Sequence, residues 1–339
     1  MEVFGNTDDG ADVHRKGISG GGLSANIISW GAVIQDLRLE GHRPPLVLGC
    51  EKFADYPEKS PYFGAIAGRF ANRIASGRFS IDEEEFQADQ NFLGKHTLHG
   101  GANGTGKRNW KIADTGEDFV TLTVIDAAGE MGFPGNLEIS CTYRLLPPGR
   151  LVVEFEATTD APTPCNLAHH SYFNLNDGGQ SDVLDHRLQI AAAAYLPVDD
   201  ELIPTGVVKP VEGTDFDFRL ARPIRYDSGG EQQLYDHNFC LSAQRGALRR
   251  AVWAQGNASG VEMEVWTTEP GVQFYAGGGI AEMDGGLEGR AYKAHSGFCL
   301  EAQTWPDGPN RPYFPNCILR PGETYHQVTE YRFKLPTGL

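Results

Sequence analysis

The chain has 339 residues, 40% of them hydrophobic and 10% aromatic, a composition that excludes intrinsically disordered and fibrous proteins. Its formal net charge of −16 disfavours nucleic acids and anionic membranes as partners, because both require a basic protein surface. No apolar run approaches the roughly 18 residues of a membrane-spanning helix, so we expect a globular protein with no nucleic-acid or membrane partner.

The start of the chain and its cysteines bear on location. Residues 1–10 lack the apolar segment of a secretory signal, so the expected location is the cytoplasm. The six cysteines are scattered without a C-x-x-C pair, which favours neither a disulfide framework nor a structural zinc site. Cys141 and Cys299 lie in apolar, strand-like stretches, and we expect both to be buried, reduced thiols.

Apolar and polar residues alternate with a period of two along several segments, as in strands that are half-buried in an antiparallel sheet. In chain order these segments are 120–124, 137–145, 151–157, 261–265 and 331–335. The loop at 146–150 contains Pro-Pro-Gly and predicts a hairpin between its neighbours. Residues 188–190 also alternate, so we interpret the alanine-rich stretch that follows them as extended rather than helical.

Strands without intervening helices predict an all-β sandwich or barrel. Long helical periodicity is missing, and the 42 glycines and 20 prolines punctuate the whole chain. No linker, charge block, low-complexity tract or repeat marks a boundary. We therefore expect residues 1–339 to form a single large domain.

Clusters of polar, reactive side chains among glycines and aromatics are candidates for a functional site. By itself, the string at 68–74 also fits a surface loop, and His99 has room around it because two glycines follow. His169 and His170 are adjacent, so in a strand they point to opposite faces and at most one faces a given pocket. The other clusters are 298–307 and, as a lesser candidate, 236–239.

Glu301 follows an apolar run, so we expect its carboxylate at the end of a buried strand, where an unpartnered charge is costly and functional acids are found. His99, His170 and a carboxylate also allow a metal site, but neither an H-x-H pair nor an H-E-x-x-H helix is present, and we expect no metal. No phosphate-binding loop, dinucleotide fingerprint or nucleophile elbow occurs, so no cofactor is expected.

In this order and spacing, the clusters resemble the aldose 1-epimerase, or galactose mutarotase, family over essentially the whole chain. Residues 68–74 resemble the family's G-R-x-A-N-R-I string, and 97–101 resemble its S/T-L-H-G-G string. Further matching strings follow in family order at 132–137, 197–199, 203–206, 217–219, 236–239, 272–275, 300–303 and 319–325.

The resemblance implies a large antiparallel β-sandwich, the galactose mutarotase-like supersandwich, and a cofactor-free enzyme that interconverts the α and β anomers of free aldoses such as glucose, galactose or a pentose. It implies that Glu301 is the general base at the C1 hydroxyl, that His170 is the general acid at the ring oxygen, and that His99 is a second histidine near the anomeric centre. The implied contacts to sugar hydroxyls are Asn72, Arg73, Tyr172, Asp236 and Gln273.

The chemistry of ring opening also suits these groups, because one proton must leave one oxygen and another must reach a different oxygen. A carboxylate and an imidazolium are the minimal set. The expected partner is a monosaccharide, and the expected state is a monomer or a weak homodimer. We expect His237 to be structural and His169, which stands where the family commonly has Asn, to face away from the site.

Two other functions remain open. The first is a non-catalytic sugar-binding protein on the same scaffold, which the presence of Glu301, His170 and His99 disfavours. An epimerase of hexose 6-phosphates would need an additional basic cluster, which the sequence does not show. The departures from the family strings at His169 and at 104–106 bear on the preferred sugar rather than on the reaction.

Overall fold

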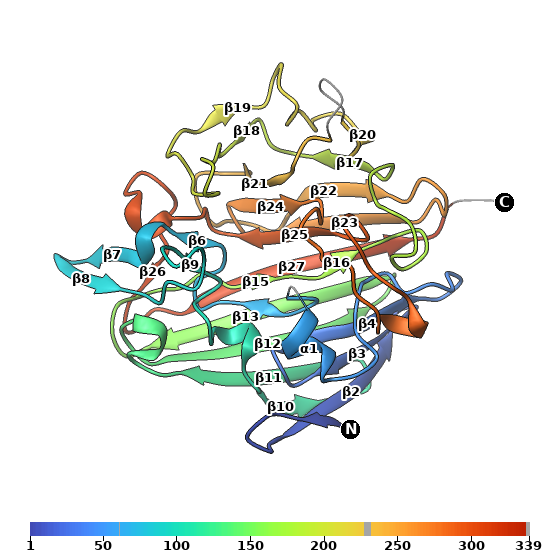
Figure 1. The fold of residues 1–339 in the computed structure, drawn as a ribbon, viewed down its shortest axis with the longest axis horizontal. Coiled ribbons are helices and arrows are strands. Elements are labelled where there is room, and N and C mark those ends of the chain that lie inside the picture. The colour runs from blue at the N-terminus through green and yellow to red at the C-terminus, as the bar shows by residue number, and fades with distance from the viewer. Residues whose placement is uncertain (61, 227–231, 337–339) are drawn as a thin grey trace.

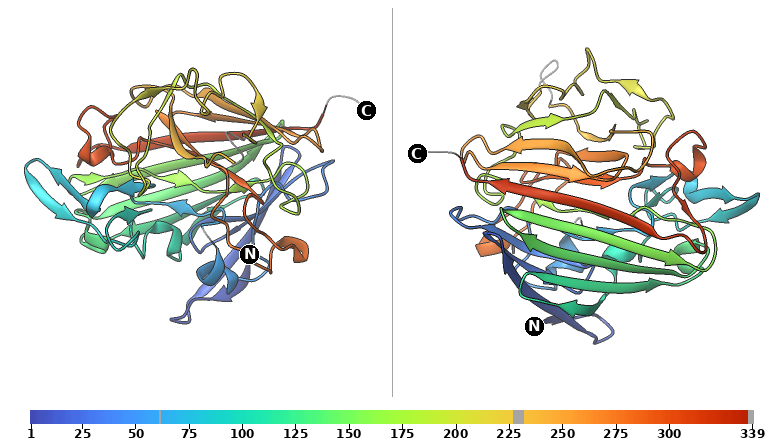
Figure 2. Two further views of the ribbon diagram at one scale, coloured as in Figure 1. Left: turned by 45° about the horizontal axis from the view of Figure 1, so that its top comes forward. Right: turned by 180° about the vertical axis from the view of Figure 1, so that it is seen from behind.

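The computed structural model describes residues 1–60, 62–226 and 232–336, and antiparallel strands make up most of it (Figure 1). The largest sheet has nine strands in the order β10-β11-β12-β13-β27-β23-β22-β17-β20. Its strands are β10 (Lys111–Thr115), β11 (Phe119–Asp126), β12 (Leu137–Leu146), β13 (Arg150–Thr159), β27 (Tyr325–Lys334), β23 (Glu262–Thr267), β22 (Arg249–Gln255), β17 (Arg187–Ile190) and β20 (Arg222–Pro223). Seen from behind, it forms one continuous layer (Figure 2, right).

The alternating segments of the sequence form strands of this sheet, as predicted. Along β12, residues 137, 139, 141, 143 and 145 are buried while the residues between them are partly or fully exposed. The register pairs Leu146 with Arg150, so β12 and β13 form the expected hairpin. Residues 187–190 form β17. In the alanine-rich stretch that follows, residues 191–193 belong to no helix and no strand, and Ala194 begins β18.

A six-stranded sheet, β16-β25-β24-β21-β18-β19, packs against the large sheet and completes a sandwich. Its strands are β16 (Tyr172–Phe173), β25 (Phe298–Gln303), β24 (Gly271–Tyr275), β21 (Asp236–Cys240), β18 (Ala194–Tyr195) and β19 (Lys209–Pro210). Phe155 of β13, Phe274 of β24 and Leu300 of β25 belong to one hydrophobic core between the two sheets. The predicted large antiparallel β-sandwich is confirmed.

Smaller elements surround the sandwich. A four-stranded sheet near the N-terminus contains β1 (Glu2–Asn6), β2 (Asp12–Gly20), β3 (Leu23–Ile28) and β4 (Val33–Leu39). Two-stranded pairs join β5 (Ile66–Ala67) to β15 (Ala168–His169), β6 (Arg73–Ile74) to β9 (Thr97–Leu98), β7 (Arg78–Ile81) to β8 (Glu84–Gln87), and β14 (Thr163–Pro164) to β26 (Ile318–Leu319).

In the described part of the chain, helical structure is limited to short segments. They are α1 (Asp55–Lys59) and 3₁₀ turns at Ala75–Gly77, Thr105–Lys107, Glu130–Gly132, Leu287–Gly289 and Gly308–Asn310. Within the three described ranges, no helix has the length and apolar character needed to cross a membrane.

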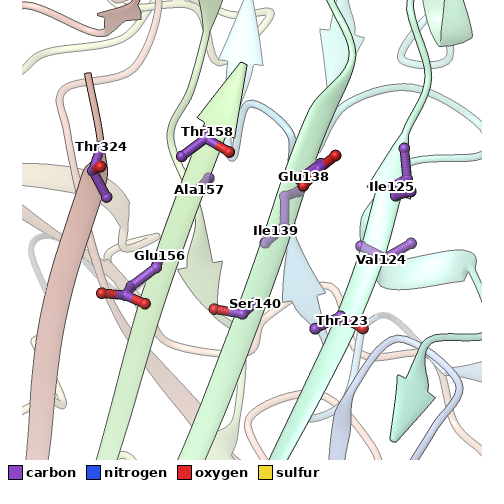
Figure 3. Close-up of a pocket in the computed structure, with 10 residues that line it drawn as sticks. All are labelled: Thr123, Val124, Ile125, Glu138, Ile139, Ser140, Glu156, Ala157, Thr158 and Thr324. Carbon is purple, nitrogen blue, oxygen red and sulfur yellow. The ribbon is translucent and has the colours of Figure 1, made fainter. Parts of the chain in front are cut away.

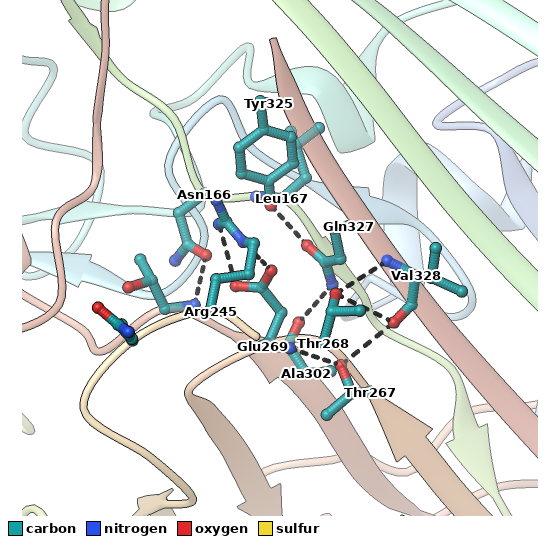
Figure 4. Close-up of polar contacts among 12 residues, drawn as sticks. Asn166, Leu167, Arg245, Thr267, Thr268, Glu269, Ala302, Tyr325, Gln327 and Val328 are labelled. Carbon is teal, nitrogen blue, oxygen red and sulfur yellow. Dashed lines mark hydrogen bonds and ion pairs between the residues drawn. The ribbon is translucent and has the colours of Figure 1, made fainter. Parts of the chain in front are cut away.

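A buried polar network ties β27 to β25 and to the segment that precedes β15 (Figure 4). The Tyr325 hydroxyl donates to Oε1 of Gln327 over 2.5 Å, and Nε2 of Gln327 donates to the carbonyl of Ala302 over 3.0 Å. The Tyr325 hydroxyl also accepts the backbone N–H of Leu167. The buried Glu269 carboxylate pairs with Arg245, whose guanidinium lies 4.4 Å from the centre of the Tyr325 ring.

Candidate active site

A cavity of about 520 Å³ lies beside the six-stranded sheet, over the face that carries Glu301. It contains seven of the eight residues that the sequence analysis placed at the site: Asn72, Arg73, His99, His170, Tyr172, Asp236 and Glu301. The remaining wall includes Tyr62, Leu98, Leu202, Leu234, Tyr235, Tyr275, Ala276, Gly278, Gly279 and His295. Segments far apart in the sequence therefore converge on one hollow whose size suits a small molecule.

Glu301 lies inside β25 rather than at the end of a strand, which is the position that the sequence predicts. All six residues of β25 are buried, because the hydrophobic core covers one face of the strand and the elements of the site cover the other. Oε1 of Glu301 lies 3.5 Å from Nε2 of His170, and Oε2 has no hydrogen-bond partner within the described part of the chain. One oxygen of the carboxyl group therefore lies near an imidazole, while the other remains available to accept a proton.

Burial shifts the proton affinities of this pair in opposite directions. It lowers the pKa of His170 to about 4, because a buried imidazolium loses its hydration. Burial, with a further contribution from the negative charge of Asp236, holds the pKa of Glu301 well above its usual range. Both shifts favour the neutral forms, namely a protonated Glu301 and an unprotonated His170. A single proton shared by the two groups therefore resides on Glu301 when no sugar is bound.

His99 is held by its own backbone and that of Asn72. Its N–H donates to the Asn72 carbonyl over 2.9 Å, and the Asn72 N–H donates to Nδ1 of His99 over 3.1 Å. Both residues adopt left-handed backbone conformations, with φ of +51° for His99 and +62° for Asn72. Because Nδ1 accepts a hydrogen bond, the neutral ring carries its proton on Nε2. Burial also lowers the pKa of His99 well below its usual value, so this histidine is a neutral donor.

Asp236 connects two of the other predicted residues. Nε2 of Gln273 donates to its Oδ1 over 2.7 Å, and a terminal nitrogen of Arg73 lies 3.3 Å from its Oδ2. Arg73 and Asp236 line the cavity, whereas Gln273 is buried, pairs with Glu301 across β24 and β25, and does not line the cavity. The structure therefore places Gln273 in contact with Asp236 rather than at the cavity wall.

Tyr62 is a wall residue that no sequence motif indicated. Its ring centre lies 4.7 Å from that of His99 and 5.9 Å from that of His170, so it covers both imidazoles. Nζ of Lys107 lies 5.3 Å from the same ring. Tyr62 also borders a neighbouring cavity of about 310 Å³ and separates it from the site. A single aromatic residue in a loop carries no periodic signal, which is why the sequence did not reveal it.

His169 faces away from the cavity, as predicted. It belongs to β15 and lies in the core, where Nδ1 is 3.5 Å from the Tyr143 hydroxyl and the ring centre is 5.6 Å from that of Tyr331. His170 points to the opposite side, toward Glu301. The alternation of side chains along an extended segment explains the difference.

The donor pattern of the site does not suit a metal ion. His99, His170 and Glu301 offer ligand atoms within 4.8 Å of one another, a spacing that a metal would need. A histidine that binds a metal through one nitrogen donates a hydrogen from the other. His99 shows the reverse arrangement, since its Nδ1 accepts the Asn72 N–H and its Nε2 carries the proton. The geometry therefore favours proton transfer and hydrogen bonding over metal binding.

A second hollow, of about 590 Å³, lies on the outer face of the nine-stranded sheet (Figure 3). It is lined by Thr123, Val124, Ile125, Glu138, Ile139, Ser140, Glu156, Ala157, Thr158 and Thr324. Its carboxylates, Glu138 and Glu156, have no imidazole or guanidinium beside them among these lining residues. The hollow lacks the paired acid and base that the other cavity contains.

Comparisons with known proteins agree with this geometry. The family model described as aldose 1-epimerase matches residues 18–332. The chain is 43% identical to the galactose mutarotase of Rattus norvegicus, over 98% of each chain, and 38% identical to the aldose 1-epimerase of Escherichia coli K12, over 92% of each. It is also similar to the crystal structure of a GalM/aldose epimerase homologue from C. elegans, with a TM-score of 0.88, 28% identity, and coverage of 96% of this chain and 100% of that one.

Proposed function

The chain belongs to the aldose 1-epimerase family and is an enzyme with mutarotase activity on aldoses, and we propose that Glu301 and His170 perform the two proton transfers of the reaction. Its substrate is a small sugar. The observation that carries the proposal is the buried pair itself, with Nε2 of His170 3.5 Å from Oε1 of Glu301 in the wall of the cavity.

In the proposed reaction, the Glu301 carboxylate takes the proton from the C1 hydroxyl while Nε2–H of His170 gives a proton to the ring oxygen. The bond between C1 and the ring oxygen breaks, and the C1–O bond becomes the carbonyl of an open-chain aldehyde. Rotation about C1–C2 exposes the other face of the aldehyde. The same two transfers then run backwards and close the ring as the other anomer.

The proton balance explains why burial of the pair is useful. Ring opening moves one proton from His170 to Glu301 through the sugar, so an ion pair becomes a neutral pair. Burial lowers the pKa of His170 and raises that of Glu301, and both shifts favour the neutral pair. The protein environment therefore stabilises the ring-opened side of the reaction, which is the side that costs free energy in water. The carboxylate and imidazolium expected from the sequence are therefore the state of the pair before ring opening. This ion pair is less stable in the protein than the neutral pair that follows ring opening.

We assign the remaining residues supporting roles. His99 donates Nε2–H to an oxygen at the anomeric end and stays neutral, because its pKa lies well below the usual value. Asn72, Arg73, Tyr172 and Asp236 line the cavity and contact sugar hydroxyls. Gln273 acts through Asp236, which it holds by a hydrogen bond of 2.7 Å.

Replacing Glu301 with Gln tests the proposal. The amide keeps the shape of the side chain and loses the base, so the rate of mutarotation should fall about 10²- to 10⁴-fold while sugar binding stays within a few-fold. Polarimetry of freshly dissolved α-glucose, α-galactose and xylose, with EDTA present, measures the rates and shows the preferred aldose. His170→Asn, which removes the proposed acid, should lower the rate similarly. His237→Asn is its matched control and should retain most activity, because His237 packs on Phe216 and does not line the cavity. Near-normal turnover by Glu301→Gln would show that another group is the base.

A further inference from the structure

The sulfur of Cys299 lies beside the imidazole of His170. Sγ is 3.5 Å from Nδ1 of His170, while the other ring nitrogen, Nε2, is 3.5 Å from the Glu301 carboxylate. Cys299 is fully buried in β25, two residues before Glu301, and does not line the cavity. The two nitrogens of His170 therefore have different partners, one inside the protein and one at the site.

The reaction places a condition on Nδ1. In the imidazolium, both nitrogens carry protons, and ring opening removes the one on Nε2. The neutral ring must then keep its remaining proton on Nδ1, because only a bare Nε2 can take a proton back when the sugar recloses. Which nitrogen of a histidine is protonated is set by the hydrogen bond that the other one makes. An acceptor at Nδ1 is therefore required throughout the cycle.

We propose that Cys299 is a positioning residue whose sulfur accepts a hydrogen bond from Nδ1–H of His170. The neutral ring thereby keeps its proton on Nδ1, so that the proton exchanged with the sugar is always released and taken up at Nε2, which faces Glu301. This inference rests on the acid role proposed for His170. No atom of Cys299 is consumed in the reaction, and its thiol proton stays on the sulfur.

Neighbouring strands fix the position of the sulfur. Cys299 pairs with Tyr172 of β16 on one side and with Tyr275 of β24 on the other. The Tyr172 side chain hydrogen-bonds to the same sulfur. Burial raises the pKa of the Cys299 thiol well above its usual value, so the group remains a neutral thiol. A neutral sulfur is a weak acceptor, which orients the imidazole without neutralising its charge as a carboxylate would.

Nitrogen NMR tests the direction of this hydrogen bond. Long-range ¹H–¹⁵N spectra of the ¹⁵N-histidine-labelled protein distinguish the two neutral tautomers, and His170→Asn identifies the His170 signals by their loss. We expect the Nδ1–H tautomer of His170 in the wild-type protein at neutral pH. In Cys299→Ala, which removes the acceptor, the Nε2–H tautomer should become the major form. Cys299→Ser, whose hydroxyl accepts a hydrogen bond, should restore Nδ1–H.

Steady-state rates test the consequence. Cys299→Ala should lower kcat about 10-fold, which corresponds to about 1.4 kcal/mol, and should leave KM within about 2-fold. Cys299→Ser should recover most of kcat. Cys141→Ala is the matched control, since Cys141 is another fully buried strand cysteine but lies in β12, and it should leave kcat and the His170 tautomer unchanged.

The outcomes separate this inference from the proposed function. An Nε2–H tautomer in the wild-type protein, or a Cys299→Ala variant with unchanged tautomer and kcat, would overturn the role of Cys299 even if His170→Asn is inactive. Full activity of His170→Asn would instead overturn the acid role of His170. A loss of kcat in Cys141→Ala equal to that in Cys299→Ala would also overturn the inference, because packing alone would then explain the loss.

Discussion

The histidines show, at the scale of single residues, how burial and hydrogen bonding separate one side-chain type into different roles. His170 has a carboxylate on one nitrogen and a thiol on the other, and it can exchange a proton. His99 has a backbone N–H on Nδ1, and it can only donate from Nε2. His169 lies in the core between two tyrosine rings. Their neighbours, rather than the imidazole itself, decide what each can do.

The proposed roles of His170 and Glu301 predict the pH dependence of kcat/KM, because the pair is expected to be active with one shared proton. As pH falls through about 4, the pKa of His170, the pair takes up a second proton and loses its base. On the alkaline side, activity falls when the pair loses its only proton, at the raised pKa of Glu301. Burial lowers the pKa of His169 to about 3, so this residue adds no charge in the working range. His169→Asn should therefore leave both limbs of the profile in place.

A pH–rate profile of His169→Asn beside the wild-type protein checks this expectation. Displacement of either limb by about one pKa unit, equivalent to about 1.4 kcal/mol, would show that His169 tunes the pair after all. The ranking of aldoses by polarimetry should also stay the same, because His169 does not line the cavity.

At the scale of elements, the site depends on how neighbouring strands hold β25 and the segment that leads to β15. Alternate residues of β25 face the core and the site, so its packing directly sets the position of Glu301. Gln327 of β27 donates a hydrogen bond to the carbonyl of Ala302, which is next to Glu301. Tyr325 of the same strand accepts one from the backbone of Leu167, which lies three residues before His170. One long strand of the large sheet thus braces both partners of the reactive pair (Figure 4).

Gln327→Leu should destabilise the fold and impair the site together. It removes the buried acceptor of the Tyr325 hydroxyl proton and the Gln327 donor to the Ala302 carbonyl, which costs about 1–3 kcal/mol for each group left unsatisfied. Urea unfolding and polarimetry measure both effects. His326→Ala, on the exposed face of the same strand, should change stability by no more than about 0.5 kcal/mol and leave kcat intact. Equal effects of the two variants would contradict a specific brace.

At the scale of the whole molecule, the sandwich provides a core large enough to bury ionisable groups. Burial lowers the pKa of His169 to about 3 and that of His186 to about 4, although neither lines the cavity. An unfolded chain returns both to about 6.5, so below that pH the unfolded state binds more protons than the folded one. Their contribution to stability is complete above 6.5 and is lost as pH falls toward 3–4.

The free energy of unfolding should therefore decrease on mild acidification. From about pH 6.5 to about pH 5.5, these two histidines together should account for about 2 kcal/mol of the loss measured by urea unfolding at each pH. His99, His170 and His237, whose pKa values burial also lowers, add to the total. His169→Asn removes one titrating group and should reduce this loss by about 1 kcal/mol. The same slope in the variant and the wild-type protein would show that His169 is not held neutral in the folded state.

The sequence by itself determined the fold class, the reaction and most of the candidate site. Period-two alternation along segments such as 137–145 predicts strands because one sheet face must meet a core, and that pattern is local. The reactive residues stand in recognisable strings, and adjacent histidines in extended chain must diverge, which placed His169 and His170 correctly.

Only the tertiary structure decided how these residues work. Tyr62, the buried position of Gln273, the placement of Glu301 within β25 and the contact between Cys299 and His170 all depend on segments that are distant in sequence. The proton state of the reactive pair likewise follows from desolvation by the surrounding strands and from the charge of Asp236. Hydrophobic periodicity is a property of neighbours along the chain, whereas hydrogen-bond direction and solvent exclusion are properties of neighbours in space.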